Sequence, residues 1–290
     1  MAVAEVAMSN DVGEGLDRLE MPVNSKPPLP RRIATVVIPK LAAIGFFLLV
    51  WQLVYMSGIK PDYVIPSPSD VWSSLVSYWQ QGSVTEAIWT SIMRAAFGYA
   101  ASVVIGTPLG LLMARVRIVR LALGSTISAL QSLPSVAWVP LGLVVFGPNN
   151  TTIYFVVIMG AFPSIVNGMA HAVDQIPPVL LRAARTMGMR GLRLWWYAVI
   201  PAAMPGYVAG LRQAWSFSWR SLMAAELITR SADLGLGLGQ LLDFGRELPN
   251  MSVVIMSILL ILIVGIAVDS LIFNPLDRVV RERRGLIAEV

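Results

Sequence analysis

The sequence predicts an all-α, polytopic membrane protein with about six transmembrane helices. Of its 290 residues, 56% are hydrophobic and only 13% are charged, whereas soluble domains carry about 25% charged residues. Several apolar runs reach about 18 residues or more, which is the length that a helix needs to cross a bilayer. The composition therefore excludes a soluble enzyme.

Six apolar segments are long enough to span the membrane. We place them at about residues 36–57, 88–114, 121–146, 152–172, 197–222 and 251–273. The third contains Pro134 and Pro140, which weaken helical hydrogen bonding and are tolerated where the backbone lines a cavity. The fifth is unusually polar, since Arg212, Ser216 and Arg220 lie inside it.

A short amphipathic helix is expected between the first two spans. Three prolines open this segment, and apolar side chains then recur at helical spacing. These side chains are Val71, Trp72, Leu75, Val76 and Trp79. Such a helix is typical of the membrane surface.

The basic residues predict that both ends of the chain are cytoplasmic. Of the 22 Lys and Arg residues, 15 lie in the N-terminal tail, the 115–120 loop, the 174–196 loop and the C-terminal tail. Only Lys60, Arg230 and Arg246 lie in the segments on the other side. Cytoplasmic loops of membrane proteins carry such an excess. Because these residues sit between apolar runs, the basic balance does not indicate nucleic acid.

Three regions follow from this topology. Residues 1–33 are polar and partly acidic, and we expect a disordered cytoplasmic tail. Residues 34–275 form the transmembrane domain, and residues 276–290 form a basic cytoplasmic tail.

The motifs of nucleotide hydrolysis, covalent catalysis and metal binding are missing from the sequence. None of the three lysines follows a glycine, so no Walker A loop is present. There is no Gly-x-Ser-x-Gly elbow. Cysteine is absent and His171 is the only histidine, which does not suffice for a zinc site. Gly235, Gly237 and Gly239 have the wrong spacing for a dinucleotide loop. We expect no enzymatic activity and no cofactor in this chain.

The basic segment between the fourth and fifth spans carries a specific pattern. Pro177 and Pro178 favour the first turn of a helix, and Gly188 favours its end. Two alanines precede Gly188 at a fixed distance, and a proline follows, in the spacing Ala183-Ala184-x3-Gly188-x9-Ala198-x-Ile200-Pro201. A basic helix that lies on the membrane surface without a protein partner is the alternative, but it does not predict this spacing.

The spacing resembles the EAA loop of bacterial ABC-importer permeases, Glu-Ala-Ala-x3-Gly-x9-Ile-x-Leu-Pro, with Arg182 in place of the glutamate. Three further segments resemble the branch that transports nitrate, sulfonate, taurine or bicarbonate. They are Ile65-Pro66-Ser67-Pro68-x2-Val71, Leu133-Pro134-Ser135-x-Ala137-Trp138-x-Pro140-Leu141, and Ala224-Ala225-Glu226. The resemblance covers about residues 40–275.

The resemblance implies a type I ABC-importer permease fold. The chain would be the membrane subunit of an ATP-driven importer for a small anionic solute in the bacterial cytoplasmic membrane. The implied partners are two ATPase subunits that hold ATP and Mg²⁺, an extracytoplasmic solute-binding protein, a second permease copy forming a homodimer, and the lipid bilayer.

The resemblance also implies that residues of about 176–196 form a coupling helix, which seats on the ATPase. Small residues would let the partner approach, and arginines would face an acidic rim. The expected contact residues are Arg182, Ala183, Ala184, Arg185, Gly188 and Arg190.

Polar residues inside spans usually face the protein interior or a cavity. Arg212, Ser216 and Arg220 are four residues apart and share one face of the fifth helix. We expect this face to line an anion pathway, in which guanidinium groups attract the solute. The other expected lining residues are Trp215, on the fifth helix, and Gln131, Ser135 and Trp138, which would form one face of the third.

Structural roles are the alternative for both arginines. Arg220 would extend its charge to the outer interface, and Arg212 would pair with Glu226 or Asp269. The motifs Gly106-x3-Gly110 and Gly206-x3-Gly210 permit close helix approach, either within the chain or between two copies.

Two other classes of protein account for part of the sequence. An ion-coupled secondary transporter would need inverted repeats and charged residues in its spans; no convincing repeat is present and acidic residues inside the spans are scarce. A non-transport scaffold would explain the topology but not the EAA-like loop. Dependence of uptake on a separate ATPase separates the three classes.

Overall fold

The structure, a computed structural model, describes residues 29–61, 63–231, 234–282 and 284. Within these ranges the chain is helical or in turns, without a β-strand, which confirms the all-α prediction. The chain divides into two compact units, Met1–Val50 with Arg284–Val290, and Trp51–Arg283.

Helix α2 (Leu29–Met56) supplies the described helix of the first unit. Its part Ile38–Met56 is long and apolar enough to cross a membrane, in agreement with the predicted first span. The helix begins at Leu29, within the last residues of the predicted tail. The rest of that tail lies outside the described residues.

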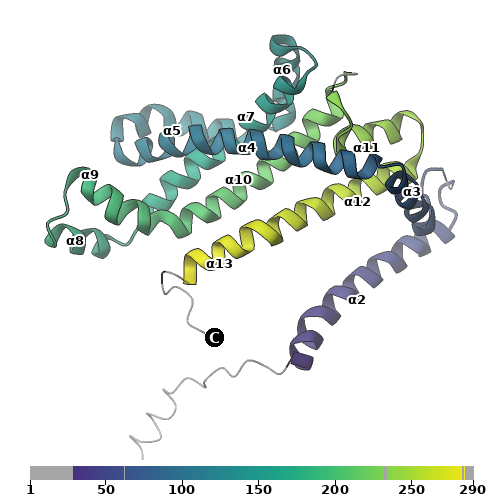
Figure 1. Cartoon of the computed structure of the whole chain (residues 1–290), viewed down its shortest axis with the longest axis horizontal. Helices are drawn as coiled ribbons and strands as arrows, with labels where there is room; N and C mark the ends of the chain where they lie inside the picture. Colours follow the sequence, from purple (N-terminus) through teal and green to yellow (C-terminus); the bar gives the residue numbers. More distant parts are fainter. Residues whose placement is uncertain (1–28, 62, 232–233, 283, 285–290) are drawn as a thin grey trace, which may run out of the picture. The chain divides into compact units, whose positions relative to one another are not determined.

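The helices after α2 belong to the second unit (Figure 1). They are α3 (Pro68–Gln80), α4 (Ser83–Arg115), α5 (Arg117–Ser132), α6 (Trp138–Phe146), α7 (Asn150–Asp174), α8 (Pro178–Thr186), α9 (Gly191–Leu194), α10 (Ile200–Ile228), α11 (Leu238–Glu247), α12 (Met251–Val268) and α13 (Asn274–Glu282). A 3₁₀ turn, Ser135–Ala137, precedes α6. Single π-helical segments, Trp195–Val199 and Asp269–Phe273, join α9 to α10 and α12 to α13.

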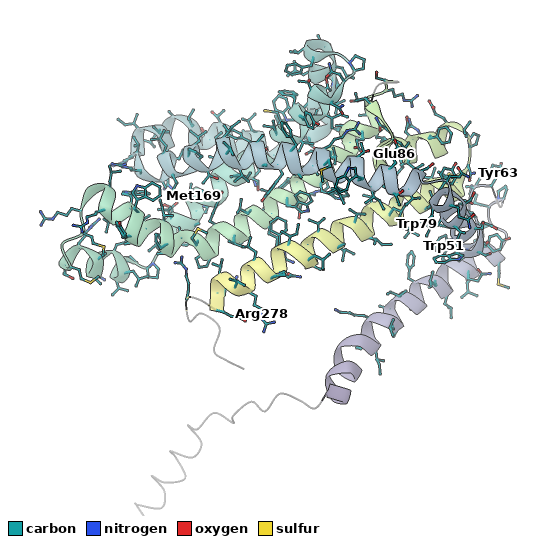
Figure 2. The ribbon with its side chains drawn as sticks, in the orientation of Figure 1. Trp51, Tyr63, Trp79, Glu86, Met169 and Arg278 are labelled. Carbon is teal, nitrogen blue, oxygen red and sulfur yellow. The ribbon has the colours of Figure 1, made fainter. Side chains whose placement is uncertain are left out.

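The predicted amphipathic helix is α3, and its start is fixed by a capping box. The Ser67 hydroxyl accepts a hydrogen bond from the Asp70 N–H at 3.2 Å, and the Asp70 carboxylate accepts one from the Ser67 N–H at 3.1 Å. Val71 is buried, whereas Trp72 and Trp79, the latter labelled in Figure 2, are exposed. One face of α3 therefore packs on the protein and the other remains free.

Four helices in the described part of the chain are long and apolar enough to be membrane spans. They are Ile38–Met56, Ser83–Arg115, Asn150–Asp174 and Met251–Glu282, and the pair Arg117–Ser132 with Ser135–Phe146 qualifies only as a bent unit. Helix α10 has 29 residues, about 43 Å, but its polar side chains keep it from meeting the same test. The count of six spans and the cytoplasmic placement of both termini stay predictions.

The expectation of one continuous third span is wrong, because the chain breaks at Pro134. Proline forces the preceding residue out of the helical region, and Leu133 has φ −69° and ψ 134°. Helices α5 and α6 consequently meet at an angle of 96°. Gln131, Ser135 and Trp138 therefore lie on three different elements and not on one helix face.

Helix α7 packs between α4 and α10 (Figure 1). Glycines permit the close approach on the α4 side, where a Cβ atom at Gly98, Gly106 or Gly110 would lie 2.5, 3.0 or 2.7 Å from an α7 side chain. The facing residues are Val157, Ile165 and Met169, the last labelled in Figure 2.

On its other side α7 crosses α10 with its backbone almost in contact. A Cβ atom at Gly168 would lie 3.0 Å from the Gly210 Cα atom, and one at Gly206 would lie 3.1 Å from the Ala172 Cβ atom. The two glycine motifs of the sequence thus serve packing within the chain.

A buried ion pair joins α4 to α10. Arg94 is 3% exposed and Glu226 is fully buried, and the Arg94 Nη1 atom lies 2.8 Å from the Glu226 Oε1 atom. Arg94 also donates to the Asn150 side chain at 2.9 Å and to the Leu234 carbonyl. The pair therefore connects α4, α10, the first turn of α7 and the segment before α11.

The other carboxylate oxygen of Glu226 is held by two donors. It accepts hydrogen bonds from the Ser91 hydroxyl at 2.7 Å and from the Gly239 N–H at 3.0 Å. A Cβ atom at Gly237 would lie 2.5 Å from the Glu226 carboxylate. The Gly-x-Gly-x-Gly segment is thus a backbone cradle for an internal carboxylate.

Replacing Glu226 by Ala should lower the thermal stability of the detergent-purified protein far more than replacing Asp174 by Ala. The first change leaves Arg94 buried and unpaired, which costs about 3–5 kcal/mol. The second change removes the ion pair between Asp174 and Arg120, whose side chains are 44% and 38% exposed, respectively. Such exposed pairs contribute about 0–1 kcal/mol. Thermal unfolding followed by circular dichroism measures both, and equal losses would contradict the assigned role.

Replacing Gly160 by Ala should destabilise the contact between α7 and α10 by about 1–3 kcal/mol. The new Cβ atom would lie 1.9 Å from the Ser221 hydroxyl oxygen and 2.8 Å from its Cβ atom. The double variant with Ser221→Gly removes both atoms and should recover most of the loss, apart from the helical cost of the new glycine, about 1 kcal/mol. Ser221→Gly alone measures that cost, and a double variant no more stable than Gly160→Ala would refute the contact.

Candidate functional site

The segment between α7 and α10, residues 176–196, is called the coupling segment below. Helix α8 begins with proline in its first turn and ends in a Schellman motif. The Met189 N–H donates to the Ala184 carbonyl at 3.1 Å, and the Gly188 N–H donates to the Arg185 carbonyl at 3.0 Å. Gly188 has φ +83° and nothing within 4 Å of a Cβ position. Glycine is therefore required at position 188 by the backbone conformation and not by crowding within the chain.

The two motif alanines face different sides of α8. Ala183 is exposed, whereas Ala184 is only 4% exposed. Leu181, three residues before Ala184, packs on a core cluster that contains Ile176 and Val199. Ala184 therefore packs on its own chain, where its small side chain lets α8 sit close, and its expected contact with an ATPase stays a prediction.

The free surface of the coupling segment combines positive charge with apolar side chains. Arg182, Arg185 and Arg190 are exposed, as predicted. Exposed apolar side chains lie among them, namely Val179, Leu180, Met187 and Leu192, with 51–70% of each accessible. Clustered apolar side chains with a charged rim are typical of a protein interface.

The predicted polar face of α10 is present. Ser216 and Arg220 are exposed and Arg212 is partly exposed, on the side of α10 that also carries the exposed Gln213. Trp215 does not flank this face, because it is 7% exposed and packs in an aromatic cluster. Its ring lies 5.4 Å from that of Tyr99 and 6.1 Å from those of Trp219 and Phe273.

Arg212 is held by an acidic partner. Its Nε atom donates to Asp269 Oδ1 at 2.6 Å, and its Nη2 atom donates to Asp269 Oδ2. The structural alternative for Arg212 is therefore present in the structure, with Asp269 as the partner, since Glu226 is taken by Arg94.

Arg220 folds back along its own helix. Its Nε atom donates to the Ser216 carbonyl at 3.1 Å, and its guanidinium lies 4.7 Å from the centroid of the Phe217 ring. The side chain remains exposed. Its charge is thus available to a solute or to a second chain.

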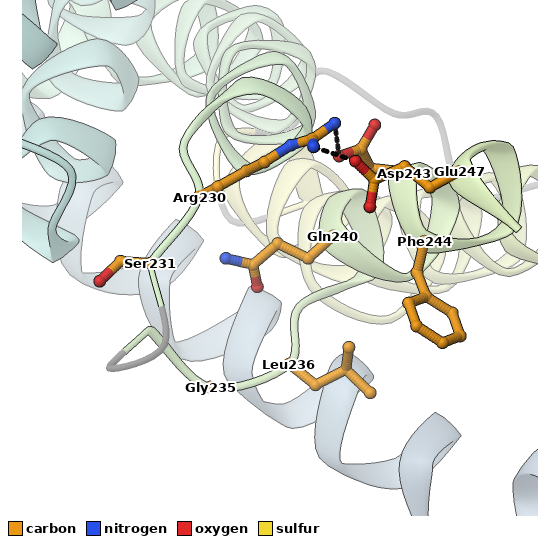
Figure 3. A pocket seen from close by; sticks show the side chains of 8 residues that line it. All are labelled: Arg230, Ser231, Gly235, Leu236, Gln240, Asp243, Phe244 and Glu247. Atoms are coloured by element: carbon orange, nitrogen blue, oxygen red, sulfur yellow. Dashed lines mark hydrogen bonds and ion pairs between the residues drawn. The ribbon is translucent and has the colours of Figure 1, made fainter.

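A surface pocket of about 580 Å³ opens beside α11, at the end of the second unit where α10 finishes (Figure 3). Arg230, Ser231, Gln240, Asp243 and Glu247 supply its polar lining. Arg230 pairs with both Asp243 and Glu247. Since one arginine faces two carboxylates, the charged lining is net negative and does not favour an anion.

A second cavity, of about 430 Å³, lies between α5, α7 and α10, and is called the α5–α7–α10 cavity below. Gln131 is the one predicted pathway residue in its lining. The other lining residues are Ser164, Asn167, Gly168, His171, Ala172, Gln175, Gly206, Ala209, Gly210 and Gln213. The α7 side of the cavity was not among the predicted residues. Ser164, Asn167, His171 and Gln175 nevertheless recur at spacings of three and four residues, which places polar side chains on one face of an apolar helix.

Comparison with known proteins identifies the family. Residues 106–281 match the binding-protein-dependent transport system inner membrane component family. A protein of Methanocaldococcus jannaschii assigned to the ABC transporter permeases is 30% identical, over 80% of this chain and 87% of its own length.

Two further relatives have named solutes. The nitrate import permease protein of Leptolyngbya laminosa is 27% identical, over 83% of this chain and 88% of its own length. The taurine transport system permease protein of Escherichia coli is 27% identical, over 83% and 87%.

A solved structure has the same fold. The inward-facing MetNI methionine ABC transporter superposes with a TM-score of 0.57 at 22% identity, covering 70% of this chain and 97% of that chain. This multi-pass membrane protein therefore belongs to the binding-protein-dependent transport system inner membrane component family and has the fold of ABC-importer permeases.

Proposed function

We propose that the chain is the permease subunit of an ATP-driven importer for a small anionic solute of the nitrate, taurine or other sulfonate, or bicarbonate type. The similarity to nitrate and taurine permeases supports the solute class. The observation that carries the proposal is the EAA-like coupling segment, folded as a short helix with an exposed basic and apolar surface.

The coupling segment would seat on an ATPase subunit at the cytoplasmic face. Its apolar side chains fill a groove, and Arg182, Arg185 and Arg190 meet an acidic rim. The segment runs through the π-helical residues Trp195–Val199 directly into α10. A displacement of α8 on nucleotide binding would therefore be passed to the helix that carries the polar face.

A second permease copy would cover the polar face of α10. Ser216 and Arg220 are exposed on a helix of the membrane domain, and polar side chains that face lipid are costly. Two copies with these faces together would enclose a polar pathway, while an extracytoplasmic solute-binding protein would deliver the solute at the α11 end. Two ATPase subunits, with their ATP and Mg²⁺, would complete the importer.

An ion-coupled secondary transporter is not favoured. Carboxylates in the spans that bind and release a proton or ion are common in such proteins. Here Glu226 on α10 is engaged by Arg94, and Asp269 after α12 is engaged by Arg212.

The chain purified from native membranes should carry a separate ATPase, and Ala183→Asp should remove it. The exposed Ala183 can be changed without disturbing the buried face of α8, and a carboxylate would oppose the acidic rim. The measurement is ATPase activity in the eluate together with gel filtration of the permease. Arg117→Glu, an exposed change at the start of α5, is the matched control. A wild-type permease that is well folded but elutes without an ATPase would support the secondary transporter instead.

Replacing Arg212 should affect mainly stability, whereas replacing Arg220 should affect mainly anion uptake. Arg212→Ala leaves Asp269 unpaired and should lower the unfolding temperature, and the double variant with Asp269→Ala should regain it. Arg220→Gln should leave stability unchanged and reduce anion uptake, because the exposed charge is lost. Full uptake in Arg220→Gln would remove Arg220 from the pathway.

A further inference from the structure

The α5–α7–α10 cavity contains a buried hydroxyl without a hydrogen-bond partner. Ser164 is 3% exposed, lines the cavity, and its Oγ atom makes no hydrogen bond. Ser102, Ser221 and Ser257 instead donate to the carbonyl four residues earlier, at 2.7–2.8 Å. A buried hydroxyl without a hydrogen bond is unfavourable, so the Ser164 hydroxyl can donate to an acceptor that enters the cavity.

A pair of amides beside Ser164 is fixed in orientation. The Asn167 Nδ2 atom donates to the Gln131 Oε1 atom at 2.6 Å. This bond uses the carbonyl of Gln131, so its NH₂ group and the second N–H of Asn167 remain available as donors. Ser164 and Asn167 are three residues apart on α7 and share one side of the helix.

The cavity is lined without a formal charge. Lys, Arg, Asp and Glu are absent from its lining, which consists of amides, small residues, Ser164 and His171. On α10 the charge next to the cavity is that of Arg212, which precedes Gln213 and is paired with Asp269. The exposed guanidinium of Arg220 lies seven residues beyond Gln213, or about 10 Å along the helix. The neutral donors of the cavity therefore lie apart from the exposed guanidinium.

We propose that the α5–α7–α10 cavity is a second station for the transported oxyanion, held by the neutral donors of Ser164, Asn167 and Gln131 and not by a guanidinium. The choice of an oxyanion rests on the proposed function. Charge attracts the solute near Arg220, whereas hydrogen bonds alone hold it weakly enough to leave, as transport requires at every site along a path.

The cavity is also joined to the coupling segment. Gln175 lines the cavity and is the C-terminal capping residue of α7, two residues before Pro177. Its Oε1 atom lies 3.7 Å from the Cβ position of Gly206 on α10. A movement of α8 would therefore carry one wall of the cavity with it, so that release from this station follows the state of the ATPase.

The test uses a single introduced thiol, because the chain contains no cysteine. Ser164→Cys in the full-length permease, purified with its ATPase and reconstituted in liposomes, is treated with a sulfonate-bearing methanethiosulfonate. Labelling is followed by intact mass. Nitrate, taurine and bicarbonate are the competing probes. We expect labelling without solute, and a rate about tenfold lower with one of the three at ten times its Kd.

Two controls define the outcome. Ser73→Cys, exposed on α3, should label at a rate that no solute changes, and Ser257→Cys, fully buried on α12, should stay unlabelled while the protein is folded. If Ser164→Cys fails to fold, Ala209→Cys, exposed in the same cavity, replaces it. Absence of labelling, or labelling that none of the three solutes slows, overturns the proposal.

Uptake by the wild-type complex separates this inference from the proposed function. ATP-dependent uptake without protection at Ser164→Cys would refute the cavity and leave the importer in place. Protection without uptake or ATPase would keep the cavity and refute the importer.

Discussion

Glu226 is fully buried where α10 ends, and an unpaired carboxylate there would cost several kcal/mol. Arg94 from α4, the Ser91 hydroxyl and the Gly239 N–H satisfy it, and Arg94 in turn holds Asn150 at the start of α7. Helices α4, α7 and α10 thus meet at one charge pair. Because each partner comes from a different segment, a shift of any one of these helices at this end would break a contact of the buried charge pair.

Close packing and the α5–α7–α10 cavity have the same origin. Gly168 and Gly210 bring the backbones of α7 and α10 almost into contact, and Gly206 does the same against Ala172. Residues without side chains leave space beside the crossing, and the longer amides of Gln131 and Gln213 border that space instead of filling it. A larger side chain at these positions would both separate the helices and occupy the cavity, so the packing of α7 on α10 and the volume of the cavity depend on the same glycines.

Hydrophobic runs were sufficient to predict most helices, the amphipathic α3 and the ends of α8, because these follow from local periodicity, prolines and glycines. Features that depend on tertiary packing could not be predicted from the sequence. Pro134 and Pro140 indicated weakened helical hydrogen bonding, but they did not indicate that the chain turns by 96° at Pro134. Ala184 and Trp215 were assigned to a partner and a pathway, whereas packing against the rest of the chain buries both. The sequence left Glu226 and Asp269 as alternative partners of Arg212, because choosing between them requires knowing where α12 lies. The polar face of α7 follows from the spacing of its polar residues but was not predicted.

The Schellman ending of α8 has a mechanical consequence. A nine-residue helix is too short to persist alone in water, but here its carbonyls are occupied by the Gly188 and Met189 N–H groups and its inner face is anchored through Ala184. The helical shape of the segment is therefore held by contacts within the chain. Under the proposed function, a segment held in this way would pass a displacement of a bound ATPase on to α10, whereas a segment that unfolded locally would absorb that displacement.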